Sequence, residues 1–140
     1  MKKYISLAAL AVFLPAAASA QAYRAVNDLT VVPLQGGSFE VIEGRGEGPR
    51  GIWCAAAEYA ERRLGADGRV YIQDGRGPAR SVAGRKSVVF TTDARALSQP
   101  PSQSIALSTS QIGIGLPVDH AIQFCRDIFD RDDRIIRQRF

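Results

Sequence analysis

Near the start of the chain, two short runs of residues have the pattern of strands that are buried on one face. Residues 28–34 (DLTVVPL) are rich in β-branched side chains, and residues 38–43 alternate apolar with polar positions. The glycine-containing segment 35–37 joins the two runs, so the pattern predicts a β-hairpin. Pro33 has no N–H to donate, which indicates that the first strand lies at a sheet edge or ends early.

Two later segments have the apolar spacing of α-helices. Residues 52–64 carry apolar side chains on one helical stripe, and Gly65 follows where a left-handed C-terminal cap is common. A second helix is predicted to begin at Pro117, because the missing N–H of a proline costs nothing in the first turn. Its apolar stripe continues as far as Phe129.

The segments between the two helices predict further strands. Residues 69–73 and 86–92 have strand character, with a turn predicted over 74–78. Residues 98–104 contain two prolines and predict an exposed connection, and residues 104–115 have room for one or two weak strands.

The predicted order of elements is β-β-α-β-β-(β)-α. This order is typical of a single small α+β domain, in which a mostly antiparallel sheet of four or five strands carries two helices on one face. The chain of 140 residues has 46% hydrophobic and 23% charged residues, which is ordinary globular composition.

The first twenty residues have the three parts of a secretory signal peptide. Lys2 and Lys3 form a positive start, residues 4–14 are apolar, and Ala18-Ser19-Ala20 is a typical cleavage sequence. The apolar run is about eleven residues long, short of the ~20 that span a bilayer. We therefore expect cleavage after Ala20, a periplasmic or secreted protein, and no membrane insertion once the signal is removed.

The mature protein is expected to be residues 21–140, one domain with a fraying helical tail at 131–140. Removing Lys2 and Lys3 from the 18 basic residues leaves 16 against 14 acidic ones, a net charge of +2. That surplus is too small for extensive neutralisation of phosphates, so we expect no nucleic-acid partner.

The only two cysteines, Cys54 and Cys125, fall on the two predicted helices. In an oxidising compartment such a pair most often forms a disulfide. The alternative is a catalytic thiol, for which His120 is the only histidine base in the chain. One histidine and two bonded cysteines would not supply the ligands of the common zinc sites, so we predict neither metal nor cofactor.

Two glycine-rich loops carry the arginines that we select as a candidate anion-binding site. The loop 44–51 precedes a helix, where backbone N–H groups favour anions, and the loop 74–80 adds further positive charge. If the two loops meet at one end of the sheet, they form a basic rim; otherwise they are solvated loops. The predicted arginine rim consists of Arg45, Arg50, Arg76 and Arg80.

Three segments resemble small secreted proteins of Gram-negative bacteria that carry no assigned function. The segments are residues 51–60 (GIWCAAAEYA), residues 86–91 (KSVVFT) and residues 124–126 (FCR). The resemblance implies secretion and pairing of Cys54 with Cys125. It implies no activity, substrate or active-site residue.

The sequence therefore predicts a non-catalytic binding or interaction module, with an anionic ligand or a periplasmic protein as its partner. The alternative is a small periplasmic hydrolase that uses His120 and a carboxylate from elsewhere in the fold. A hollow that encloses both groups would favour the enzyme, whereas an open basic face would favour the binding module.

Overall fold

A computed structural model describes residues 21–126, which are built around a six-stranded antiparallel sheet. The strand order is β1-β2-β3-β5-β4-β6, and each neighbouring pair is antiparallel. The α+β class and the antiparallel sheet are as predicted, but the sheet has more strands than the four or five expected. The predicted leader 1–20, and the tail from residue 127 onward, lie outside the described residues.

The predicted hairpin is confirmed as strands β2 (Thr30–Pro33) and β3 (Phe39–Ile42). A 3₁₀ turn, η1 (Gln35–Gly37), joins them. The two-residue strand β1 (Tyr23–Arg24) pairs with the start of β2, so Pro33 lies beyond the residues that β1 pairs with. A proline is tolerated there because no N–H is needed.

Helix α1 (Pro49–Leu64) is buried on more sides than the single apolar stripe in its sequence predicts. It begins before Ile52, because Pro49 suits the first helical position, and it ends at Gly65 in the predicted left-handed cap. The ten consecutive residues Gly51–Ala60 are all buried, so most of the helix is covered on every side. Helices of this kind lie inside a protein rather than on its surface.

The predicted turn at 74–78 is wrong, because strand β4 (Arg69–Pro78) continues through it to pair with β5 (Lys86–Thr91). The glycines in this segment lie at register shifts, not at a chain reversal: the shifts fall between Ile72 and Asp74 and between Asp74 and Gly77. Bulged strands tolerate such glycines. The chain reverses in the loop that follows Pro78.

The start of the second helix also differs from the prediction. Pro117 ends the edge strand β6 (Gly115–Pro117) and occupies the N-cap position of helix α2 (Val118–Ala121). A proline is tolerated in an edge strand because the sheet needs no N–H on its outer side. The short α2 continues as a 3₁₀ helix, η3 (Ile122–Cys125).

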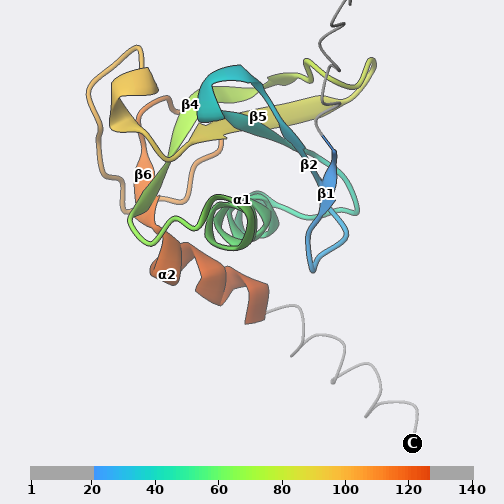
Figure 1. The fold of residues 1–140 in the computed structure, drawn as a ribbon, viewed down its shortest axis with the longest axis horizontal. Coiled ribbons are helices and arrows are strands. Elements are labelled where there is room, and N and C mark those ends of the chain that lie inside the picture. Colours follow the sequence, from blue (N-terminus) through green and yellow to red (C-terminus); the bar gives the residue numbers. More distant parts are fainter. Residues whose placement is uncertain (1–20, 127–140) are drawn as a thin grey trace, which may run out of the picture.

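The elements form three layers, with α1 between the sheet and the α2–η3 segment (Figure 1). The helices were expected to pack together on the sheet, but α2 and η3 contact mainly α1. The core lies between α1 and the sheet. There the Trp53 ring is 5.1 Å from that of Phe90, and the Tyr59 ring is 4.7 Å from that of Phe39. Within residues 21–126, no helix is long and apolar enough to cross a membrane.

Candidate functional site

Cys54 and Cys125 are joined in a disulfide, as predicted, with their Cα atoms 5.0 Å apart. The bond links α1, which lies in the middle of the fold, to η3. Both cysteines are buried. The carboxylate of Glu58 lies within 4.8 Å of both sulfurs, an arrangement that suits a metal ion only with free thiolates. Because both sulfurs are bonded to each other, neither is available as a nucleophile or as a thiolate ligand.

Glu40 is a fully buried carboxylate on the face of the sheet opposite α1. The backbone amides of Arg80 and Ser81 donate to it at 3.0 and 2.8 Å, and the hydroxyls of Ser81 and Ser87 donate as well. Burial raises the pKa of Glu40, but these hydrogen bonds outweigh it and hold the pKa below its usual value. The carboxylate therefore holds the loop 79–85 against the sheet.

The loop 79–85 forms one wall of an open hollow of about 300 Å³, which we call the arginine hollow. The other walls come from the turn between β1 and β2 and from the end of β3. Three guanidinium groups and one carboxylate line the hollow, together with neutral residues. Its lining residues are Arg24, Asp28, Leu29, Thr30, Ile42, Gly44, Arg45, Val82 and Arg85.

Two of these arginines are held by contacts within the protein. Nε of Arg24 donates to Oδ1 of Asp28 at 2.7 Å, and this bond, with a smaller contribution from the charge of Arg45, lowers the pKa of Asp28. Nη2 of Arg85 donates to the backbone oxygen of Glu43 at 2.6 Å. The same Nη2 lies 2.9 Å from the place that a Cβ would take on Gly44, so only glycine leaves room for it there.

Asp28 and Arg45 also share an uncommon backbone conformation. Their φ angles are 64° and 58°, and within residues 21–126 they are the two non-glycine residues with positive φ. Aspartate adopts the left-handed region fairly readily, but for arginine it is costly, by about 1 kcal/mol or more. Both residues line the arginine hollow.

The four arginines of the predicted rim have different surroundings in the structure. Arg45 lines the arginine hollow, whereas Arg50 lies at the start of α1 with its guanidinium 5.3 Å from the centre of the Phe124 ring. Arg76 forms a bidentate pair with Glu43 at 2.6 and 2.8 Å, and Arg80 pairs with Asp74. The loops do approach one another, because the ends of β3 and β4 both pair with the start of β5.

Arg24 and Arg85 were not among the four arginines of the predicted rim. Arg24 reaches the hollow through the pairing of β1 with β2, and Arg85 reaches it through the Glu40-bound loop. Neither arrangement has a local sequence signal. The Gly-Arg-Gly sequence around Arg45 was the one available clue, since it lies in a turn.

His120 lies at a second, more apolar surface hollow, which we call the His120 groove. It consists of two compartments of about 270 Å³ each that share Ser104, Leu116 and His120. The His120 ring packs edge-on against Phe124, with the ring centres 5.7 Å apart. Among residues 21–126, those lining the two compartments include no aspartate or glutamate, so the predicted pairing of His120 with a carboxylate is not seen there.

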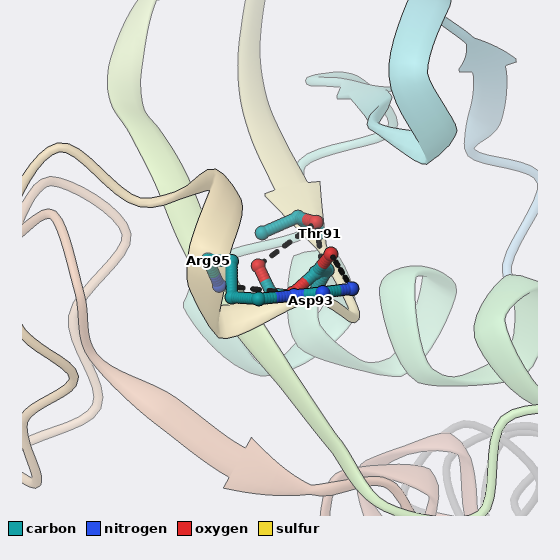
Figure 2. Close-up of polar contacts among 3 residues, drawn as sticks. All are labelled: Thr91, Asp93 and Arg95. Carbon is teal, nitrogen blue, oxygen red and sulfur yellow. Dashed lines mark hydrogen bonds and ion pairs between the residues drawn. The ribbon is translucent and has the colours of Figure 1, made fainter.

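A third polar cluster, at the end of β5, forms a local cap rather than a hollow (Figure 2). Oδ1 of Asp93 accepts from the backbone and side-chain nitrogens of Arg95 at 2.9 and 3.0 Å, and Oγ1 of Thr91 accepts from the amide of Asp93 at 3.1 Å. Hydrogen bonds from Arg95 lower the pKa of Asp93. The cluster begins the 3₁₀ helix η2 (Ala94–Ala96), and Arg95 lines neither hollow.

Comparison of the chain with family models, with curated proteins and with solved structures finds no significant match. The resemblance to secreted Gram-negative proteins therefore stays a prediction, and the function has to be inferred from the two hollows.

Proposed function

We propose that this protein is an exported, non-catalytic binding module that takes a phosphate or carboxylate group in the arginine hollow. The observation that carries the proposal is the convergence of Arg24, Arg45 and Arg85 on one hollow beside the single carboxylate of Asp28. Three positive charges against one leave a local excess of two. An oxyanion would balance that excess.

The guanidinium groups have donors to offer such a ligand. Each guanidinium carries five N–H donors. The hydrogen bonds of Arg24 to Asp28 and of Arg85 to Glu43 orient the side chains and leave further N–H groups on each. Because the arginines are already held in place before the ligand binds, less side-chain conformational entropy is lost on binding.

The backbone of Arg45 supports the same site. Arg45 adopts a left-handed conformation between two glycines, either of which would tolerate it more readily. Residues in energetically costly backbone conformations are common at functional sites, because the conformation orients a side chain that the function needs.

Binding is favoured over the hydrolase alternative by the surroundings of His120. A hydrolase of the predicted kind needs a carboxylate within hydrogen-bond reach of the imidazole. The compartments on both sides of His120 are instead lined by apolar, neutral polar and arginine side chains.

The test of binding uses inorganic phosphate as the probe and follows backbone amide shifts by NMR. We expect saturable shifts in residues 24–30 and 42–46, and an affinity that falls as salt rises. The double variant Arg45→Gln/Arg85→Gln should weaken binding by more than about tenfold, because two charged hydrogen-bond donors are lost. Arg95→Gln is the matched control and should bind as the unaltered protein does.

Two outcomes would contradict the binding proposal. One is a phosphate titration without saturable shifts, and the other is equal affinity in the double variant and the unaltered protein. Export is tested separately by the intact mass of protein recovered from the periplasm. That mass should correspond to a chain beginning at Gln21, and a chain that keeps Met1 would contradict it.

A further inference from the structure

We infer that the His120 groove is a second binding site, separate from the arginine hollow, and that its ligand is a small amphipathic carboxylate. Such a ligand has one carboxylate and an alkyl or aromatic tail. The inference goes beyond the proposed function, since the arginine hollow would bind an oxyanion without regard to a tail.

One compartment of the groove supplies an apolar surface, and its one charged lining residue, Arg50, lies over the Phe124 ring. Leu107, Leu116 and Phe124 line it and are only partly buried, although all three pack against the core. Ile105 lines the same compartment and is fully exposed. A tail laid in this compartment would cover apolar surface that otherwise contacts water, which stabilises the bound state.

The other compartment supplies hydrogen-bond donors. Arg69, Gln103 and Ser104 line it, and none of the residues lining it is acidic. Nη2 of Arg69 donates to the backbone oxygen of Gly115 at 2.7 Å, which fixes the guanidinium beside strand β6. Oγ of Ser104 accepts from the amide of Ala106 at 3.1 Å, so its hydroxyl hydrogen can be donated to a ligand.

His120 stands where the two compartments meet. It lines both of them, and its ring is held edge-on against Phe124. Ser104 and Leu116 line both compartments as well, so Arg69 and Gln103 are confined to one compartment and Phe124 to the other. A ligand with its carboxylate at Arg69 and its tail against Phe124 matches this arrangement.

The dimensions suit a small molecule. Each compartment holds about 270 Å³, and typical ligand pockets begin near 300 Å³. Two neighbouring compartments of this size accommodate a short chain, not a folded partner. Apolar side chains combined with a few polar groups are the usual composition of a small-molecule site.

The test titrates the protein with octanoate and follows amide shifts by NMR. We expect saturable shifts in residues 103–107 and 114–124. Octan-1-ol lacks the charge and acetate lacks the tail, so both should bind at the His120 groove much more weakly. Affinity should rise about fourfold for each methylene added between hexanoate and octanoate, as expected for burial of a CH₂ group.

Two variants distinguish the loss of contacts to the ligand carboxylate from a loss of protein stability. Arg69→Gln should weaken octanoate binding by at least about tenfold, through the loss of a charged donor. Because Arg69 also holds Gly115, Gln103→Ala is the second variant, at an exposed residue. It should weaken octanoate binding by several-fold and leave the melting temperature unchanged.

The two sites can fail independently. Arg45→Gln/Arg85→Gln should leave octanoate binding intact, and Arg69→Gln should leave phosphate binding intact. The inference is overturned if octanol binds as well as octanoate, if acetate does so, or if octanoate shifts the amides of the arginine hollow instead. Unchanged octanoate affinity in both Arg69→Gln and Gln103→Ala would overturn it as well.

Discussion

The backbone amide of Ser81 donates a 2.8 Å hydrogen bond to Oε1 of Glu40, which lies 41 positions earlier in the chain. The bond joins the loop between β4 and β5 to the middle of the sheet. Val82 and Arg85 belong to the same loop and line the arginine hollow. A carboxylate that takes no part in the proposed binding thus shapes the wall of the site.

Replacing this carboxylate should destabilise the protein. In Glu40→Gln, a neutral amide would replace an anion that four donors surround, and its NH₂ group would face two of those donors. We expect the free energy of unfolding to fall by about 2–3 kcal/mol, measured by urea denaturation at neutral pH. Ser81→Ala removes one donor and should cost about 1 kcal/mol. A larger loss in Ser81→Ala than in Glu40→Gln would contradict this view of the loop.

Stability should also depend on pH through Glu40. Its hydrogen bonds hold its pKa in the folded protein below the usual value for a glutamate, which applies in the unfolded chain. Stability from this group is therefore complete above the unfolded pKa and is lost as pH falls through the folded one. Urea denaturation over a series of acidic pH values should show a steeper fall for the unaltered protein than for Glu40→Gln, and equal slopes would contradict the assignment.

Gly44 should matter for binding but little for stability. In Gly44→Ala, the new Cβ would lie 2.9 Å from Nη2 of Arg85, a flexible side-chain end that can move away. We expect weaker phosphate binding, because Arg85 leaves its position, with a change in unfolding free energy below about 0.5 kcal/mol. Gly68→Ala is the control, since no atom lies within 4 Å of its Cβ position. Unaltered phosphate affinity in Gly44→Ala would mean that Arg85 takes no part.

Gly75 and Gly77 form a matched pair that tests the unexpected length of β4. An added Cβ on Gly75 would lie 2.3 Å from the backbone oxygen of Ser110, whereas on Gly77 its nearest neighbour would be 3.7 Å away. We expect Gly75→Ala to cost about 1–3 kcal/mol, since backbone must move, and Gly77→Ala to cost less. Thermal unfolding of the two variants gives the comparison, and equal stabilities would argue against the close approach.

Reduction of the disulfide should lower the free energy of unfolding, although the fold should be retained. The bond between Cys54 and Cys125 closes a loop of 71 residues, which corresponds to about 4 kcal/mol of loop entropy. Urea denaturation with and without a reducing agent measures the difference. The double variant Cys54→Ala/Cys125→Ala should be insensitive to the reducing agent, and an unaltered protein that is equally insensitive would contradict the prediction.

The sequence alone was sufficient for features that depend on neighbouring residues. The hairpin of β2 and β3, the cap at Gly65 and the position of α1 follow from periodicity and from the conformations open to glycine and proline. The disulfide was also predictable, because only two cysteines were available to pair.

Tertiary structure decided the features that depend on contacts between distant segments. The glycines of 74–78 resemble a turn locally, yet pairing with β5 and the approach of Ser110 keep them in β4. Burial of Glu58 and Glu40 likewise required partners more than thirty positions away. The arginine hollow is of the same kind. Arg24, Arg45 and Arg85 meet because the sheet brings together strand β1, the loop after β3 and the loop before β5, and spacing along one chain carries no signal for that meeting.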